Sequence, residues 1–334
     1  MSGHIKIGFV FIIEHGDLEN KGLLLAKSLR RFFNTSEECP IFAVQPRKGK
    51  IIRESTIKQL RELNVDYIYK PINVKWKNLP FANQAYGCSI IEEKVKDTIQ
   101  TLVYLDADII CLGYPYNLFL DENEDVAVSP VDLVSSSTIR VGEELDDYWK
   151  FVYGLNKVKK EQLWSVKTKL GSVEIYPTFN SGVIAVKPEL GVFERWKNMF
   201  EISFNKGYFG LFSPLSKEFF FTDQTFLSSL IIAMFDRKRI RILSDEYNFP
   251  INVEYLNGKG IVKMSDIKLL HYHSWMYNFN WTKFFEIDND FKQWLIPMLP
   301  LAREHHSRHL VFLEVASQLL KHYLWKIKLK FAVK

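Results

Sequence analysis

The chain has 334 residues, 47% of them hydrophobic and 25% charged, which is the composition of an ordinary globular protein with one large or two small domains. The formal net charge is +5, and all of it comes from residues 301–334, where lysines and arginines outnumber glutamates by seven to two. Residues 1–300 therefore balance to zero, which argues against a nucleic-acid-binding protein with a broad basic face.

The three cysteines, Cys39, Cys88 and Cys111, have neither a pairing pattern nor the spacing of a metal site, which is typical of a reducing compartment. The apolar run at 5–13 is too short for a signal peptide and lacks a cleavage site of small residues. No apolar stretch has the length of a membrane span. We therefore expect a cytoplasmic protein.

The first third of the chain alternates between strand and helix patterns. Residues 6–13, 41–45, 66–69 and 101–105 are short, mostly apolar runs that predict strands, and residues 22–33, 53–63 and 81–96 have the spacing of amphipathic helices. This order predicts an α/β fold with a mostly parallel sheet and helices on both faces. Ligands of such sheets bind at the carboxyl ends of the strands.

The remainder is less regular. Strands are predicted at 126–130 and 183–186, helices at 189–204 and 222–235, and two last strands at 239–243 and 268–273 that close the sheet. Residues 131–172 are polar and aromatic, and they indicate an insertion over the sheet edge that either contacts a ligand or only decorates the surface. The absence of repeats and flexible linkers favours one domain over residues 1–300, followed by a tail at 301–334.

Two carboxylates stand one residue apart at the end of the strand predicted at 101–105. Asp106 and Asp108 are close enough to repel each other unless a cation neutralises them. Carboxylate oxygens suit Mg²⁺ or Mn²⁺, which usually share their coordination shell with substrate phosphates. The pattern therefore predicts a metal that holds a phosphorylated ligand. A strand that simply ends in a polar turn is the alternative.

Four further segments follow YLDAD at 104–108 in a fixed order: FNSGV at 179–183, TDQT at 222–225, YNF at 247–249 and LLHYH at 269–273. This ordered set resembles the GT-A fold glycosyltransferases, and most closely family 8, the glycogenin and lipopolysaccharide galactosyltransferase group. The resemblance covers residues 6–273 and does not extend to the tail. It implies a GT-A catalytic domain, and the insertion predicted at 131–172 is the candidate acceptor side.

The resemblance also implies the metal and its ligands. Asp106, Asp108 and His271 would hold Mn²⁺, or Mg²⁺, which bridges the diphosphate of a nucleotide-sugar donor, with UDP as the expected nucleotide. A histidine at a strand end without any ligand role is the alternative for His271.

Donor and catalytic residues follow from the same motifs. Asn180 would contact the donor sugar, with Gly182 allowing close approach of the backbone. Asp223 would bind sugar hydroxyls, and Gln224 would face the anomeric carbon from the acceptor side. The alternative for the TDQT segment is a helix N-cap made by Thr222 and Asp223.

Two more segments are implied to contact the donor. The loop after the first strand, with Glu14 and His15, would lie against the nucleobase and ribose, and Asn248 belongs to the segment that matches the donor site. The loop lacks the Gly-rich, Arg-containing signature of sugar-nucleotide pyrophosphorylases, which disfavours that chemistry.

One segment departs from the family pattern. The family histidine is followed by a glycine and then by a lysine, proline and tryptophan that close over the β-phosphate, whereas Ser274 stands near the glycine position and Tyr277 near the lysine position here. Lys283 is a candidate to replace the missing cation. The departure also leaves His273 open as the metal ligand in place of His271.

The resulting hypothesis is a metal-dependent glycosyltransferase that moves a sugar from a nucleotide sugar to a glycan or lipid-linked acceptor. The resemblance to family 8 implies retention of configuration. Because no side chain is a clear covalent nucleophile, we expect this retention to proceed by front-face transfer guided by Gln224. The competing hypotheses are a GT-A fold nucleotide-sugar binding protein without turnover and a protein-interaction scaffold.

The tail has apolar residues at helical spacing from Phe312 to Phe331 and five lysines after residue 320. This pattern predicts a basic amphipathic helix that lies on the inner face of an anionic membrane. A helix packed on the catalytic domain is an equal alternative, and the strict alternation at 325–331 also allows a final strand.

Overall fold

A computed structural model describes residues 5–33, 39–135, 137–211, 220–251, 256, 260–273, 283–298 and 301. The predictions for the tail after residue 301, and those for Ser274 and Tyr277, lie outside the described residues. The division at residue 300 and membrane contact by the tail therefore stay predictions. In the described part of the chain, every helix is too short or too polar to span a bilayer.

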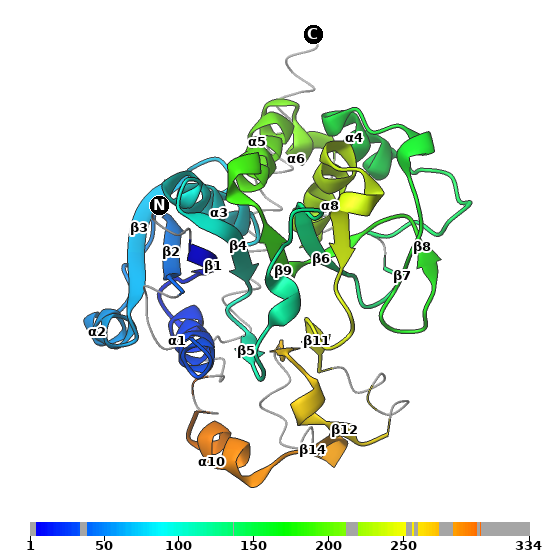
Figure 1. The fold of residues 1–334 in the computed structure, drawn as a ribbon. Helices are drawn as coiled ribbons and strands as arrows, with labels where there is room; N and C mark the ends of the chain where they lie inside the picture. The colour runs from blue at the N-terminus through cyan, green and yellow to red at the C-terminus, as the bar shows by residue number, and fades with distance from the viewer. Residues whose placement is uncertain are drawn as a thin grey trace.

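A seven-stranded sheet forms the centre of the molecule, in the order β10-β6-β9-β4-β1-β2-β3 (Figure 1). Only β9 runs antiparallel to its neighbours. The predicted mostly parallel sheet is thus confirmed. Its strands are β1 (Ile5–Ile12), β2 (Ile41–Arg47), β3 (Val65–Asn73), β4 (Ile99–Leu105), β6 (Val126–Pro130), β9 (Phe179–Val186) and β10 (Ile240–Ile242).

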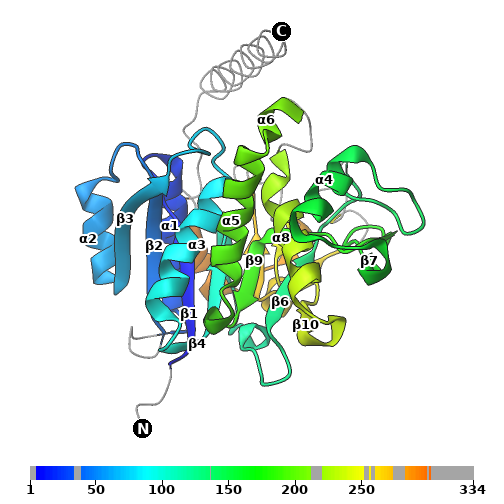
Figure 2. The same cartoon turned by 90° about the horizontal axis from the view of Figure 1, so that it is seen from above.

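Helices cover both faces of this sheet, as predicted (Figure 2). Alternate residues of a strand point to opposite faces, so Val10 and Ile12 pack with α3, α4, α5 and α8, whereas Phe9 and Phe11 pack with α1 and α2. The helices are α1 (Asp17–Arg30), α2 (Glu54–Glu62), α3 (Ala82–Val95), α4 (Asp147–Asn156), α5 (Val192–Asn205), α6 (Tyr208–Leu211), α8 (Thr222–Met234) and α10 (Asn289–Met298).

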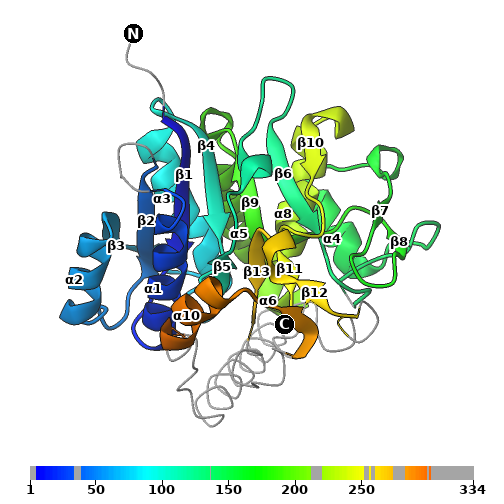
Figure 3. The ribbon, with the colours of Figure 1, turned by 60° about the horizontal axis from the view of Figure 1, so that its bottom comes forward.

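The last predicted strand does not close the main sheet, so this part of the prediction is wrong. β13 (Leu269–His271) instead pairs with β5 (Ile109–Cys111) and with β11 (Phe249–Pro250) in a separate three-stranded sheet (Figure 3). The reason lies at the Asp-x-Asp turn, where the chain leaves β4 and starts a new strand, β5, whose edge accepts β13 in antiparallel register. The turn is therefore the junction of the two sheets.

The insertion at 131–172 is partly built into the core. Trp149 and Val152 of α4 are buried in the cluster that also contains the α8 side chains, and β7 (Val166–Lys167) pairs with β8 (Glu174–Ile175). The other short elements are η1 (Tyr116–Leu118), η2 (Lys160–Gln162), η3 (Pro188–Leu190), η4 (Arg237–Arg239), η5 (Met264–Asp266), β12 (Val262–Lys263) and β14 (Phe285–Glu286).

Candidate active site

A cleft of about 450 Å³ opens at the carboxyl ends of β1 and β4, next to the start of the antiparallel strand β9. Parallel sheets bind ligands at this edge. Among the described residues, the predicted site residues that line the cleft are Glu14, Asp106, Asp108, Asn180, Asp223, Gln224 and His271. The other three, His15, Gly182 and Asn248, lie outside its lining.

The turn between β4 and β5 presents both carboxylates to the cleft. The Asp106 backbone N–H donates to the carbonyl of Gly182 at 2.9 Å, and the Asp106 carbonyl accepts from the Ile109 N–H at 3.1 Å. The Asp106 Oδ1 atom accepts hydrogen bonds from Gln84 Nε2 at 3.0 Å and from the Tyr104 hydroxyl at 2.5 Å. Residues of α3, β4 and β9 therefore orient Asp106.

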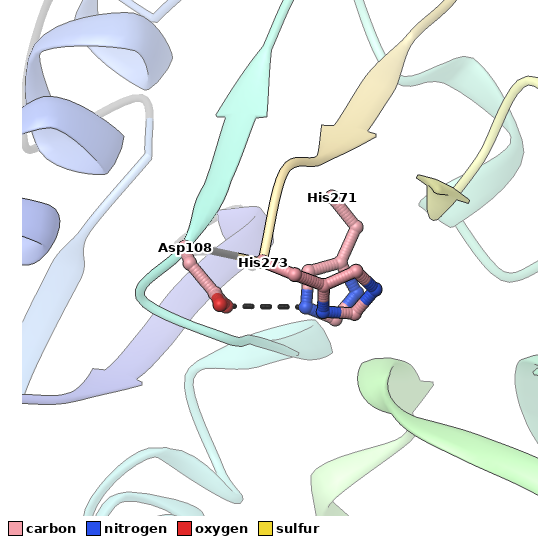
Figure 4. A group of neighbouring side chains, drawn as sticks. All are labelled: Asp108, His271 and His273. Carbon is pink, nitrogen blue, oxygen red and sulfur yellow. Dashed lines mark hydrogen bonds and ion pairs between the residues drawn. The ribbon is translucent and has the colours of Figure 1, made fainter. Parts of the chain in front are cut away.

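Asp108, His271 and His273 bring their ligand atoms within 4.8 Å of one another (Figure 4). The His271 Nε2 atom lies 3.1 Å from Asp108 Oδ1 and 3.8 Å from Asp106 Oδ2. The His271 and His273 rings are 3.8 Å apart between centroids. Carboxylate oxygens and an imidazole nitrogen converging at one point fit a divalent cation, and the two histidines are both close enough to be ligands.

The charges of this group are strongly coupled. Burial, and then the charge of Asp108, raise the pKa of Asp106 to about 6. Burial also acts to raise the pKa of Asp108, but the charge and hydrogen bond of His271 outweigh it and lower that pKa. For His271 burial acts to lower the pKa, yet the Asp108 charge and hydrogen bond raise it overall. Burial and the His271 charge lower the pKa of His273 to about 3. A cation bound between the two aspartates would relieve the repulsion that raises the pKa of Asp106.

Asn248 lies behind the histidine and not in the cleft. Its Oδ1 atom is 2.7 Å from His271 Nδ1, and its backbone has a φ of 56°. The buried Lys169 ammonium holds this backbone by donating to the carbonyls of Tyr247 at 2.6 Å and Asn248 at 2.9 Å. Asn248 therefore orients a candidate ligand, which differs from the donor contact that the sequence predicts.

Gly182 also acts from behind the cleft. A Cβ atom at this position would lie 2.8 Å from His271 Cε1, 2.9 Å from Asn180 Oδ1 and 3.0 Å from Asp106 Oδ2. Distances this short are not compatible with a side chain unless its neighbours move. The Asn180 Oδ1 atom accepts a hydrogen bond from the Gly182 N–H at 2.7 Å. The glycine is thus needed for the close packing of the carboxylate and the histidine.

The first turn of α8 delivers Asp223 and Gln224 to the cleft. The N-cap is Phe221 and forms no side-chain cap, and the Asp223 carboxylate instead accepts a hydrogen bond from the Ser181 hydroxyl. Burial raises the pKa of Asp223 to about 7. The Gln224 amide donates to the Ser137 hydroxyl at 3.5 Å, which links it to the insertion. The N-cap made by Thr222 and Asp223, the alternative from the sequence, is thus not formed, because the N-cap position belongs to Phe221.

The first loop contributes one residue to the cleft. Arg47 holds both oxygens of Glu14 at 2.5 and 2.6 Å, and the Asn83 amide donates to the same carboxylate at 3.1 Å. His15 is directed to the buried Glu19, with Nδ1 2.9 Å from Oε1. Of the two predicted nucleotide contacts, only Glu14 therefore faces the cleft.

The profile of the Rhodobacterales glycosyltransferase domain matches residues 9–234. The chain belongs to this glycosyltransferase family. The match confirms the prediction of a sugar-transferring enzyme, and it includes Asp106, Asp108, Asn180, Asp223 and Gln224 but ends before His271. A search of curated proteins found no match to the chain.

Three solved glycosyltransferase structures are similar to this chain. The galactosyltransferase LgtC in complex with donor and acceptor sugar analogues is 14% identical, with 88% of this chain and 95% of LgtC aligned and a TM-score of 0.45. GlyE of Streptococcus pneumoniae is 17% identical over 87% of this chain and 64% of its own, with a TM-score of 0.47. Mouse xyloside xylosyltransferase 1 is 14% identical over 82% of this chain and 97% of its own, with a TM-score of 0.39.

One residue of the glycosyltransferase escapes the sequence patterns. Lys21 is only 7% exposed on α1, and its charge acts to lower the pKa of both Asp106 and Asp108. A signal was present in the sequence, since Lys21 stands three residues after Leu18 and four before Leu25, on an apolar helix face where a charge is unusual. Lys283, the candidate replacement cation, is exposed and does not line the cleft.

Proposed function

We propose that this glycosyltransferase is metal-dependent and takes a nucleotide sugar, with UDP as the nucleotide, as its donor. Asp106, Asp108 and His271 would hold Mn²⁺ or Mg²⁺, with His273 beside them. The observation that carries the proposal is the convergence of Asp106 and Asp108 on His271 Nε2, at 3.8 and 3.1 Å, in the floor of the cleft. The acceptor would be a glycan or a lipid-linked sugar.

The order of the residues along the sheet edge supports one direction for the donor. Glu14 follows β1, the two aspartates follow β4, and Asn180 belongs to β9, so the three groups lie in the strand order β1, β4, β9. A nucleotide sugar has the linear order base, ribose, diphosphate and sugar. With the diphosphate at the aspartates, the ribose would lie toward Glu14 and the sugar toward Asn180 and Asp223.

The chemistry follows from this placement. When bound, the divalent ion would stabilise the charge that develops on the diphosphate leaving group. Asp223, held by the Ser181 hydroxyl, would accept hydrogen bonds from hydroxyls of the donor sugar. Gln224 would lie near the anomeric carbon, with its amide nitrogen anchored on Ser137. Because an amide is a weak nucleophile, Gln224 would not form a covalent intermediate, and the retention implied by the resemblance to family 8 would proceed by front-face transfer.

Calorimetry tests binding, and donor hydrolysis tests turnover. UDP should bind in Mn²⁺ and lose most of its affinity in EDTA, because the ion joins the diphosphate to the carboxylates. Equal UDP affinity in both buffers would contradict the metal assignment. A panel of UDP-, GDP-, ADP- and CDP-sugars then identifies the donor, and proton NMR of the first product reports its configuration. Tight donor binding without hydrolysis or transfer would favour the binding-protein hypothesis.

A further inference from the structure

The cleft is strongly acidic for a site that would bind a diphosphate. Glu14, Asp106, Asp108 and Asp223 all contribute to its lining, whereas no lysine or arginine in the described ranges does so. If a divalent ion binds, its two positive charges are cancelled by the two carboxylates that hold it. The negative charge of the diphosphate would then remain without compensation. Phosphate sites normally supply fixed cations for this purpose. Within the described ranges, a compensating charge would therefore have to act from behind the lining.

Lys21 is placed to provide this charge. α1 packs beside β5 (Figures 1 and 3), and the two elements are joined by a 3.0 Å hydrogen bond from the Cys111 N–H to the Ser28 hydroxyl. Lys21 precedes Ser28 by seven residues, or two helical turns of about 10 Å in all, on the same helix face. Asp108 precedes Cys111 by three residues, also about 10 Å in an extended chain. Counted back from the hydrogen bond between Ser28 and Cys111, Lys21 along α1 and Asp108 before β5 are therefore about equally far away.

The contacts of Leu18 and Leu24 on α1 support this position of Lys21. Leu18, one turn before Lys21, lines the cleft, and Leu24, one turn after it, belongs to the apolar cluster with Ile110 and Tyr272. On α1, Lys21 therefore stands between a residue of the cleft and a residue packed on the small sheet that carries His271. Its effect on the pKa of both aspartates is consistent with an ammonium group within charge range of them. Lysine is almost never buried without such electrostatic compensation.

We propose that Lys21 is the fixed cation that offsets the negative charge of the donor diphosphate at the metal site. This role deepens the proposed function and rests on it. It makes Lys21 a positioning residue for the diphosphate, in a place that the sequence motifs do not predict. A positive charge within range of the two aspartates repels a bare metal ion but favours the complex of that ion with an anionic ligand.

The experiment exploits these opposite effects. Full-length protein with Lys21→Met, Lys21→Arg or Lys27→Met is titrated with MnCl₂ alone, and then with UDP at saturating Mn²⁺. If wild-type protein prefers another nucleoside diphosphate in a panel, that one replaces UDP. Lys27 lies on the same helix but six residues away and only partly buried, which makes it a matched control. Lys283→Met tests the alternative cation.

We expect Lys21→Met to bind Mn²⁺ at least as tightly as wild type and to bind UDP about tenfold or more weakly, the usual effect of losing a charge-assisted interaction. Lys21→Arg should recover most of the UDP affinity, and Lys27→Met should match wild type. Unchanged UDP affinity in Lys21→Met would overturn the inference, as would parallel losses of Mn²⁺ and UDP affinity, which indicate a structural role. If wild type binds no nucleoside diphosphate, the proposed function itself fails.

Discussion

Asn248 determines which nitrogen of His271 faces the carboxylates. The Asn248 Oδ1 atom lies 2.7 Å from Nδ1 of the ring, and on the other side Nε2 lies 3.1 Å from Asp108 Oδ1. An amide oxygen only accepts hydrogen bonds, so Nδ1 carries a proton and Nε2 is the atom available to a cation. Partners of this kind fix the tautomer and the ring orientation of metal-binding histidines.

Asn248→Gly should weaken Mn²⁺ binding by about 10–100-fold, the usual cost of removing such a partner. Glycine keeps the left-handed backbone that Asn248 adopts at a φ of 56°, so the change removes the amide without straining the turn. Asn248→Asp retains an oxygen acceptor at the same place and should bind the ion better than the glycine variant. Manganese titration by calorimetry measures both. Equal affinity of Asn248→Gly and wild type would remove Asn248 from this role.

Gly182→Ala should reduce donor hydrolysis by at least about tenfold, because the added methyl group would lie 2.8 Å from His271 Cε1 and 3.0 Å from Asp106 Oδ2. Crowding of this kind typically destabilises a protein by about 1–3 kcal/mol, so urea unfolding should accompany the kinetic assay. Gly154→Ala is the matched control, since its Cβ would meet no atom within 4 Å. Wild-type hydrolysis in Gly182→Ala would show that the packing around His271 tolerates displacement.

Asp108→Asn should reduce donor hydrolysis by about 100-fold or more and leave the fold intact. The change removes a negative charge that a cation would need next to His271 Nε2, while the shape of the side chain is kept. Asp147→Asn is the control, because that side chain is 98% exposed on α4. Initial rates at saturating donor and Mn²⁺, together with circular dichroism, measure the two effects. A folded Asp108→Asn variant with normal turnover contradicts the metal assignment.

Glu92→Gln should change the pH dependence of stability. The Glu92 carboxylate is 2% exposed and accepts the N–H groups of Phe193 and Glu194 at the start of α5, at 2.9 and 2.8 Å. Burial raises its pKa from 4.5 to about 7. The folded protein therefore holds this proton more tightly than the unfolded chain, and the resulting stabilisation is complete below pH 4.5 and lost as the pH rises through 7.

Because glutamine does not titrate, Glu92→Gln should gain unfolding free energy relative to wild type between pH 5 and pH 8, by about 2 kcal/mol. Urea unfolding at both pH values gives this difference. Glu93→Gln, at a side chain that is 76% exposed, controls for the change in net charge. A difference between Glu92→Gln and wild type that is the same at both pH values would mean that Glu92 does not titrate in this range.

The sequence predicts most elements of the main sheet because short apolar runs alternate with amphipathic helices along the chain. The strand ends shift by a few residues, as between the predicted 101–105 and the observed Ile99–Leu105. The short run at 269–271 is a different case. The apolar residues Leu269 and Leu270 predict a strand, but they contain no information about which sheet edge will accept it. The pairing with β5 follows from the turn at Asp106, which is a tertiary feature.

The site also contains some features that the sequence predicts and others that it does not. Asp106, Asp108 and His271 are recognisable from their residue types at strand ends, and the structure brings them together. The position of Asn248 behind His271 depends on a left-handed backbone held by Lys169, which leaves no local pattern. The motifs do not predict Lys21, because a lysine in an amphipathic helix normally faces solvent, although its apolar neighbours Leu18 and Leu25 are a signal in the sequence. The motifs therefore name Gly182 and Asn248 without their positions behind the cleft, and they do not include Lys21.

The small sheet joins parts of the site that are far apart in the chain. β5 begins directly after Asp108, and β13 ends at His271, 163 residues later. The main sheet is complete at β10, before β11 and β13 begin, so local opening of the small sheet would separate His271 from Asp108 while the main sheet stays paired. A bound ion opposes that opening in proportion to its affinity. Amide hydrogen exchange in β13 therefore reports ion occupancy directly, without an acceptor and without turnover.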